Sequence, residues 1–321
     1  MQRRHLLATL AAAPFATPWA HAQGSDQPIR WVVPYPAGGG TDVLARTLSE
    51  AMRGPLGQNI VVDNRPGAAT NIGAELVARA KPDGLTILSA DNAVLAFNEH
   101  LFGKLPFHPE KDFSYIGAIG RFPLALVVHP DFPAKTFAEF LAHVKANPGK
   151  VNYASPGNGS PHHLAMELFK NRTGSFLVHI PYRGAAPAMA DVMGGQVPCM
   201  FLDLASGLSV MQSGKVRVLA IGSAQRSALL PGVPTLAEAG VKDSEVYAFQ
   251  GILGPAGLPA PVVARLNAEL NKSFQAPAVQ KRFADIGMEA LPGTPAQFLA
   301  LARAESKRWG AVIRAAGIRL D

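Results

Sequence analysis

The stretch VVPYPAGGGTDVLAR, residues 32–46, joins an apolar run to an amphipathic one through three successive glycines. The apolar run is typical of a buried strand, and residues 42–53 have the periodicity of an amphipathic helix. Glycine lets a backbone approach a ligand closely, and a helix N-terminus offers unpaired N–H groups with a partial positive charge. This first loop is therefore a candidate anion site.

The candidate donors of the first loop are the amides of residues 37–41. The alternative is a tight turn in which Thr41 is the N-cap of the helix. Asp42 complicates the anion hypothesis, because it places a carboxylate in the first turn. Arg46 lies four residues later, and we predict that it pairs with Asp42 along the helix flank.

A second strand, glycine-rich loop and helix follow in VNYASPGNGSPHHLAMELF, residues 151–169. In this second loop, residues 154–160, Ser160 is a natural N-cap and Pro161 suits the first helical position. No acidic residue appears before Glu167 to oppose an anion. Ser155, Asn158 and the Ser160 hydroxyl add side-chain donors.

Two histidines follow the second loop. We predict that His162 and His163 add positive charge below about pH 6.5. The alternative for His163 is a ring packed against the sheet. His163 and Glu167 are four residues apart, but no third ligand accompanies them, so no metal site is predicted.

Strand-like and helix-like runs alternate along most of the chain, which predicts an α/β fold with mostly parallel sheets and helices on both faces. The tail after about residue 250 is predicted to be helical. Strand-like runs lie at 29–35, 59–64, 85–90, 115–120, 124–130, 151–155, 176–182, 197–203, 216–222 and 251–255. Helix-like runs lie at 42–53, 72–81, 137–147, 162–171, 187–195 and 208–214.

The N-terminus, MQRRHLLATLAAAPFATPWAHAQ, has the layout of an export signal. Arg3 and Arg4 precede an apolar run, and residues 20–22 form an A-x-A cleavage site. We predict that residues 1–22 are removed on export, by either the twin-arginine or the general secretory route. No later segment has the roughly 20 apolar residues of a membrane span, so the mature chain is predicted to be soluble.

Composition argues against several classes of protein. The net charge of +7 comes from lysines and arginines spread along the chain, which does not indicate nucleic-acid binding. The single cysteine, Cys199, lies in an apolar run and is predicted to be a buried small side chain. The chain has no P-loop, no complete dinucleotide fingerprint, no G-x-S-x-G and no H-E-x-x-H. We therefore predict no catalytic residues, no metal and no cofactor.

Five segments, recurring in order, resemble the Bug family, the periplasmic solute receptors of tripartite tricarboxylate transporters. They are PYPAGGGTDVLAR (34–46), VVDNRPGAATNIGAE (61–75), YASPGNGSPHHLAMELF (153–169), HIPYRGAAPAMADVMGGQV (179–197) and LPGVPTLAEAG (230–240). The resemblance implies a two-lobed periplasmic binding protein of the type II-like class with a cleft between its lobes. It also implies a small organic carboxylate as the ligand.

The resemblance carries over a set of ligand-binding residues. From the first loop they are Tyr35, Ala37, Gly38, Gly39, Gly40 and Thr41, and from the second Ser155, Gly157, Asn158, Gly159, Ser160 and His163. Tyr182, Arg183 and Asp203 complete the set. Arg183 has an alternative as a loop arginine that holds Asp191 or a carbonyl group, and Asp203 has one as a helix cap. Tyr35, Pro156 and Phe249 differ from the residues common in the family, so the ligand's identity is not implied.

We expect one lobe to comprise 23–122 with 250–321, the other 123–249, and the hinge to lie near 121–124 and 246–251. The expected function is delivery of a carboxylate to membrane-embedded transporter subunits by a monomeric periplasmic receptor. Two alternatives stay open. One is a scavenging or sensory receptor without a dedicated permease, and the other is a hydrolase that uses Ser160 and His163.

Overall fold

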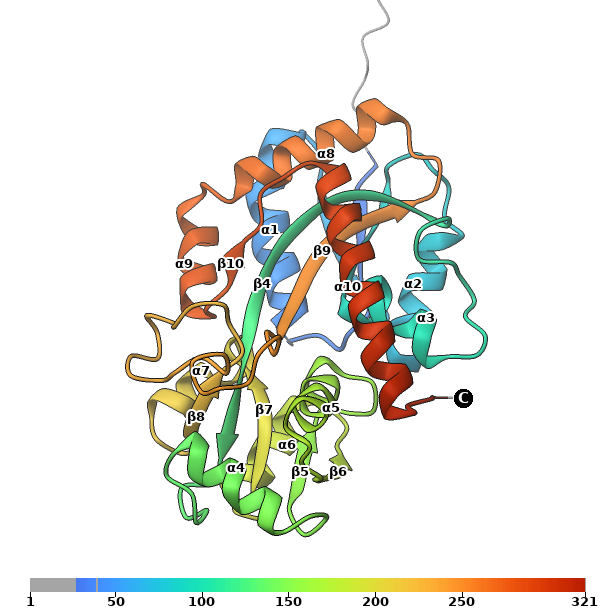
Figure 1. Ribbon diagram of the computed structural model, residues 1–321. Helices are drawn as coiled ribbons and strands as arrows, with labels where there is room; N and C mark the ends of the chain where they lie inside the picture. The colour runs from blue at the N-terminus through green and yellow to red at the C-terminus, as the bar shows by residue number, and fades with distance from the viewer. Residues whose placement is uncertain (1–26, 39, 321) are drawn as a thin grey trace, which may run out of the picture.

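The computed structural model describes residues 27–38 and 40–320 (Figure 1). The predicted export signal and Gly39 lie outside these residues. A ten-stranded mixed sheet runs through the described part of the chain. Its strands are β1 (Ile29–Val33), β2 (Ile60–Asn64), β3 (Thr86–Asp91), β4 (Phe113–Val128), β5 (Asn152–Ser155), β6 (Val178–Pro181), β7 (Cys199–Asp203), β8 (Arg217–Ile221), β9 (Tyr247–Pro255) and β10 (Glu289–Ala290).

The long strand β4 joins an upper and a lower half of the molecule (Figure 1). The strand order is β2-β1-β3-β9-β4-β7-β5-β6, and β8 and β10 also pair with β4. The first part of β4 pairs with β9 as far as Pro123, and the part from Leu124 onward pairs with β7 and β8. The strands predicted at 115–120 and 124–130 are thus one strand. Pro123, which cannot donate a ladder hydrogen bond, lies where β4 changes partner.

Parallel strands form two separate groups. β1 pairs in parallel with β2 and β3 in the upper half, and β5 pairs in parallel with β6 and β7 in the lower half. The prediction of parallel α/β units is confirmed for these groups. The strands between them differ from it, because β4 and β9 run antiparallel to their neighbours.

Helices cover both faces of the sheet (Figure 1). They are α1 (Gly40–Leu56), α2 (Asn71–Ala78), α3 (Asn98–Leu101), α4 (Phe137–Ala146), α5 (Pro161–Thr173), α6 (Ala185–Met193), α7 (Leu204–Gln212), α8 (Ala260–Ser273), α9 (Pro277–Asp285) and α10 (Pro295–Ala316). A short 3₁₀ segment, η1 (Ala68–Thr70), and a π-helical turn, η2 (Ala93–Phe97), complete the elements.

The C-terminal helices α8, α9 and α10 pack on the upper half, so the predicted helical tail is confirmed (Figure 1). α10 begins at a capping box made by Thr294 and Gln297 and ends at Gly317, which has a positive φ. These are the local start and stop signals that a helix of this length requires. Of the helices in the described residues, none combines the length and apolar character that a membrane crossing requires.

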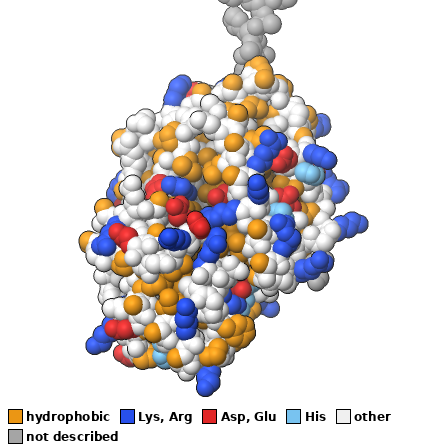
Figure 2. Space-filling model, viewed as in Figure 1, with side chains coloured by type: hydrophobic (Ala, Val, Ile, Leu, Met, Phe, Trp, Pro, Cys, Tyr) orange, Lys and Arg blue, Asp and Glu red, His pale blue; other side chains and the backbone are white. Residues whose placement is uncertain are grey.

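The apolar core is continuous between the halves on one face of the sheet. Leu88 and Phe298 of the upper half belong to the same buried cluster as Leu126 and Phe201 of the lower half. Two separate clusters lie under the other helices, one around Trp31 and one around Met200 and neighbouring side chains. Lysine and arginine side chains are scattered over the visible face and do not gather into one patch (Figure 2).

Candidate functional site

The loops that follow β1 and β5 open toward the same part of β4. In the upper half, β3 ends at Asp91 opposite Gln250 of β9, which itself pairs with Gly120 of β4. In the lower half, β7 ends at Asp203 opposite Leu124 of β4. Since β1 is parallel to β3 and β5 is parallel to β7, the carboxyl ends of both groups point to the middle of β4. Open α/β sheets bind their ligands at such strand ends.

Asp42 turns its carboxylate back onto the first loop. It is 2% exposed and accepts hydrogen bonds from the Gly38 amide at 2.9 Å, Arg46 Nε at 3.0 Å and Asn64 Nδ2 at 2.9 Å. Burial alone raises the pKa of Asp42, but these donors and the Arg46 charge outweigh it and lower the pKa. The predicted Asp42–Arg46 pair is confirmed. The Gly38 amide, expected to be an anion donor, is instead bound by the protein's own carboxylate.

Both ends of the first loop are anchored to the sheet. The Tyr35 hydroxyl donates to Asp91 at the end of β3, and Gln250 Nε2 donates to Thr41 Oγ1 at 3.0 Å. Burial raises the pKa of Tyr35 well above its usual value, and the nearby Asp91 carboxylate adds to the effect. The hydroxyl that distinguishes Tyr35 from phenylalanine therefore makes its hydrogen bond to a protein group, the carboxylate of Asp91.

Between these anchors the backbone of the first loop is open. Ala37, Gly38 and Gly40 are exposed, and a Cβ added at Gly38 or Gly40 would meet no atom within 4 Å. Gly39 lies outside the described residues. There is space for a ligand beside Gly38 and Gly40, and their contact with one stays a prediction.

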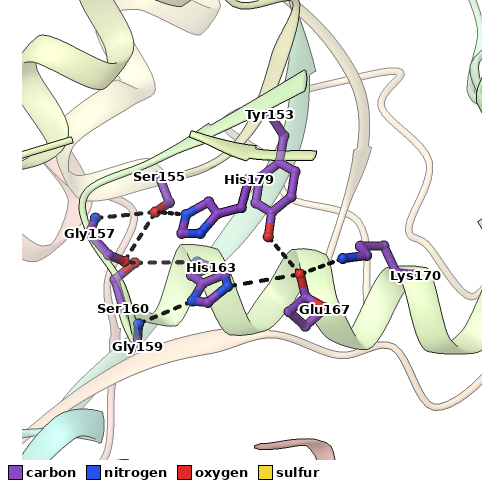
Figure 3. Close-up of polar contacts among 9 residues, drawn as sticks. All are labelled: Tyr153, Ser155, Gly157, Gly159, Ser160, His163, Glu167, Lys170 and His179. Carbon is purple, nitrogen blue, oxygen red and sulfur yellow. Dashed lines mark hydrogen bonds and ion pairs between the residues drawn. The ribbon is translucent and has the colours of Figure 1, made fainter. Parts of the chain in front are cut away.

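The second loop is held by Ser155 and His179 (Figure 3). Ser155 is fully buried, and its Oγ accepts a hydrogen bond from the Gly157 amide at 3.1 Å. The same oxygen lies 2.6 Å from Nε2 of His179, which belongs to β6. Ser155 was predicted to be a ligand donor, but its hydroxyl is engaged within the loop.

The start of α5 is capped as the sequence predicts. Ser160 Oγ accepts a 3.3 Å hydrogen bond from the His163 amide and donates a 2.8 Å hydrogen bond to the Gly157 carbonyl. The Gly159 amide donates to His163 Nδ1 at 3.1 Å. The amides of Gly157 and Gly159, both predicted anion donors, are therefore satisfied by protein groups.

His163 and His179 stack face to face. Their ring centroids are 3.9 Å apart with 9° between the planes, and the ring of Tyr153 stacks on His179 at 4.9 Å (Figure 3). Burial, followed by the proximity of His179 and Lys170, lowers the pKa of His163 to about 3. The alternative of a His163 ring packed against the sheet is confirmed, because the ring stacks on residues of β5 and β6. The prediction of a positive charge on His163 below about pH 6.5 is wrong, because this buried stack favours the neutral form.

The stacked histidines predict that the protein loses stability as the solution is acidified. In the unfolded chain each ring takes up a proton near pH 6.5, whereas in the folded protein the pKa values of His163 and His179 are about 3 and about 4. The unfolded state binds more protons between these limits, so this stability is complete above pH 6.5 and is lost as the pH falls. Between pH 7 and pH 5 we expect a loss of roughly 2–3 kcal/mol, mostly from the more buried His163.

Denaturant unfolding at pH 7, 6 and 5 measures this loss. The His163→Gln/His179→Gln variant has no titrating ring in the stack, so its free energy of unfolding should decline less steeply by the same amount. Parallel declines in the variant and the unmodified protein would show that the stack does not resist protonation.

Asn158 and Arg183 are the exposed polar side chains beside the second loop. Neither has a hydrogen bond or ion pair with another described residue, and both are exposed. The Gly184 amide donates to the Pro156 carbonyl at 2.9 Å, which fixes the Arg183 segment next to the loop. An exposed guanidinium without a described partner is suited to binding a carboxylate with two parallel hydrogen bonds.

Tyr182, predicted to be a ligand contact, is hydrogen bonded within its own segment. Its hydroxyl donates to Asp191 of α6 at 2.6 Å. Burial, with this hydrogen bond second, raises the pKa of Tyr182 to about 12. The alternative in which Arg183 holds Asp191 is wrong, because the carboxylate is taken by the neighbouring tyrosine.

Asp203 caps α7, as its alternative predicts. Oδ1 accepts from the Ser206 amide at 2.8 Å, and Oδ2 contacts His162 Nε2 at 2.8 Å and the Ser206 hydroxyl. Burial alone raises the pKa of Asp203, but the hydrogen bond and charge of His162 outweigh it and lower the pKa. Both carboxylate oxygens are occupied, whereas Nδ1 of the buried His162 has no partner in the described structure.

A third segment near the first loop has no counterpart among the predicted site residues. Ala68, Ala69 and Thr70 have φ values of 46°, 49° and 77°, a conformation that costs roughly 1–3 kcal/mol per residue and clusters at binding sites. The segment precedes α2, where a Cβ at Gly73 would lie 3.0 Å from Cβ of Pro34, just before the first loop. Alanines give no local signal of a positive φ, so sequence patterns do not reveal this feature.

Two further features of the described residues bear on where a ligand could lie. Within residues 27–38 and 40–320, no three His, Cys, Asp or Glu side chains group as a metal would need. A cavity of about 560 Å³ lies between the halves where Arg121 packs 4.0 Å over the ring of Tyr247. Neither glycine loop lines this cavity, so it is separate from the candidate site.

Comparison with known proteins shows the family of this chain. Residues 44–318 match the family model described as the tripartite tricarboxylate transporter family receptor. Protein BugT of Bordetella pertussis is 36% identical over 312 residues, covering 97% of this chain and 96% of BugT.

Two similar structures were solved with ligands. A protein of R. palustris with adipate is 31% identical, with a TM-score of 0.85, covering 92% of this chain and 99% of its own. MatC of Rhodopseudomonas palustris with bound malate is 31% identical, with a TM-score of 0.81, covering 89% of this chain and 99% of its own. The chain therefore has a periplasmic binding protein fold and belongs to the tripartite tricarboxylate transporter receptor family.

Proposed function

We propose that this protein is a receptor that binds a small organic carboxylate between its halves and delivers it to the membrane subunits of a tripartite tricarboxylate-type transporter. The observation that carries the proposal is the position of Arg183 and Asn158, two exposed polar side chains at the strand ends where both glycine loops open. Family membership supports the receptor role, and the adipate and malate of the two similar structures support the ligand class.

The bound ligand would lie between the first loop and the Asn158–Arg183 side. Most donors expected in the second loop are engaged, so charge recognition rests on Arg183 rather than on the N-terminus of α5. Charge-assisted hydrogen bonds contribute about 1.5–3 kcal/mol each, and a micromolar complex needs about 8 kcal/mol. A few such contacts suffice once the cost of closure is met.

The two lobes would close over a ligand that lies between the two glycine loops. We take the lobes to be 23–122 with 250–321, and 123–249, with the hinge near 121–124 and 246–251. A ligand held by both loops binds the closed form more tightly than the open one, and only such a preference shifts the lobes.

We further propose that the protein works in the periplasm as a monomer, after export through its N-terminal signal. The membership of the chain in a receptor family supports this location. A scavenging or sensory receptor without a dedicated permease would use the same cleft. Pull-down with membrane components distinguishes the two roles, because only a transport receptor should retain permease subunits.

We propose no enzymatic activity. The rival hydrolase needs His163 to act as the base of Ser160, yet the two ring nitrogens of His163 face Gly159 and Glu167. Ser160 Oγ donates to a carbonyl instead. The pair is not arranged as a nucleophile and its base.

Calorimetry and thermal shift with a ligand panel test the proposal. The panel pairs adipate, malate and succinate with their neutral diamides, and adds inorganic phosphate and a neutral sugar. We expect at least one acid to bind with micromolar affinity and its diamide not to bind. Binding of phosphate or sugar with no response to any acid would overturn the proposal.

A further inference from the structure

The conformation of the second loop depends on two glycines that need support. Gly157 and Gly159 have φ values of 148° and 72°, which side-chain-bearing residues rarely adopt. Asn158 lies between them and is exposed. Because glycines leave a loop flexible, something outside the loop must fix the direction in which Asn158 projects.

Each of the two stacked imidazoles holds one of these glycine amides (Figure 3). His163 does so directly, because the Gly159 amide donates to its Nδ1 at 3.1 Å. A backbone N–H is always the donor, so Nδ1 of His163 carries no proton. The ring proton is therefore on Nε2, which faces Glu167 Oε1 at 3.8 Å.

His179 holds the other amide through Ser155. Ser155 Oγ accepts from the Gly157 amide, lies 2.6 Å from His179 Nε2 and lies 3.0 Å from the Gly157 carbonyl. If Nε2 of His179 carries no proton, the Ser155 hydroxyl donates a hydrogen bond to it. If Nε2 carries the proton, it donates to Ser155, which then donates to the Gly157 carbonyl. In both arrangements His179 fixes the hydroxyl that accepts the Gly157 amide.

The pair is itself held rigidly. Tyr153 stacks on His179 at 4.9 Å and donates from its hydroxyl to Glu167 Oε1 at 2.7 Å. Lys170 donates to the same oxygen at 2.7 Å. The carboxylate of Glu167 and the ammonium of Lys170, which form an ion pair with each other, therefore lie beside the two histidines. A serine 2.6 Å from an imidazole is also the geometry of a nucleophile and its base, but Ser155 is fully buried and has no surface to offer a substrate.

We propose that His179 is a positioning residue for ligand binding: through Ser155 it fixes Gly157, so that the second loop presents Asn158 to the bound carboxylate. His163 fixes Gly159 on the other side of Asn158. This inference rests on the proposed function, since the ligand is the carboxylate that the receptor is proposed to bind. His179 begins the family segment at 179–197 but is not among the predicted ligand-binding residues, and Ser155 was predicted to contact the ligand directly.

A set of three variants tests the relay with the tightest-binding acid of the panel. His179→Phe keeps an aromatic ring in the stack but removes the nitrogen, and we expect it to weaken binding about fivefold to tenfold. Ser155→Ala should do the same, and the double variant should bind no worse than either single one, because both break one relay. His179→Gln, whose amide reaches toward the same hydroxyl, should recover most of the affinity. His143→Phe is the matched control, since His143 of α4 also contacts an aromatic ring, edge-on, with its centroid 5.1 Å from that of Phe132.

A ligand-free measurement separates failure of the relay from failure of the proposed function. In ¹H–¹⁵N spectra, His179→Phe should shift the Gly157 and Asn158 amide resonances and speed Gly157 exchange, whereas His143→Phe should leave them in place. If the unmodified protein binds no acid, the proposed function fails and the spectra still decide the relay. Unmoved resonances, additive losses of affinity, or binding within twofold of the unmodified protein in His179→Phe would each overturn the inference.

Discussion

Replacing Arg183 with alanine is expected to weaken carboxylate binding by about tenfold to 150-fold. The Arg183 guanidinium is exposed beside the second loop and has no partner among the described residues. All of its donors are therefore available to hydrogen bond a bound carboxylate. Truncation removes hydrogen bonds to a charged group that are worth about 1.5–3 kcal/mol. Calorimetry with the acids of the ligand panel measures the change.

The same substitution should leave folding almost unchanged. Exposed side chains without partners alter stability by less than about 0.5 kcal/mol, so Arg183→Ala should unfold at nearly the same denaturant concentration as the unmodified protein. Arg183→Lys should fall between the two in affinity, because an ammonium keeps the charge but not the two parallel donors. Arg172→Ala, an exposed arginine on α5, is the matched control. Equal affinities for Arg183→Ala and the control would remove Arg183 from the site.

Gly251→Ala is expected to lower the free energy of unfolding by about 3 kcal/mol, near the upper end of the usual cost of overpacking. A Cβ at this position of β9 would lie 2.1 Å from Cζ of Phe298 and 2.7 Å from two further ring atoms. Phe298 is 2% exposed and packs edge-on against Tyr115 at 5.2 Å, so its ring has little room to move away. Chemical denaturation measures the change.

Gly54→Ala is the matched control for this experiment. Gly54 is exposed in α1, and a Cβ there would meet no atom within 4 Å. Alanine should therefore change the free energy of unfolding by less than about 1 kcal/mol, because the usual gain over glycine in a helix is opposed by Pro55, which disfavours helical backbone at a preceding residue with a Cβ. Combining Gly251→Ala with Phe298→Leu should recover part of the loss by making room for the added methyl group. A Gly251→Ala protein as stable as the unmodified one would show that α10 is not packed tightly on β9.

Several features of the fold could be predicted from local patterns alone. Ser160 and Pro161 mark the start of α5, and Asp42 and Arg46 form the predicted pair. The alternation of strand-like and helix-like runs predicts the two groups of parallel strands. These features can be predicted because hydrophobic periodicity and helix capping depend only on residues close together in the sequence. The single strand β4 was missed, since Pro123 reads as a break unless the change of pairing partner is known.

The hydrogen bonds of the candidate site depend on residues that are distant in the sequence and therefore could not be predicted from local patterns. A glycine-rich turn before a helix is a potential anion site, but whether its amides are free depends on which distant groups reach them. His179 and Asn64 approach the loops from other strands, and Tyr182 rather than Arg183 takes Asp191.

By itself, the sequence determined most of the strands and helices, the cap of α5, the family and the two loops at the ends of β1 and β5. Only the tertiary structure decided that most of the second loop's donors are satisfied from within and that Arg183 and Asn158 remain unpaired among the described residues. The physical reason is that a hydrogen-bonding group is free or engaged according to its neighbours in space, and the chain brings those neighbours together only when it folds.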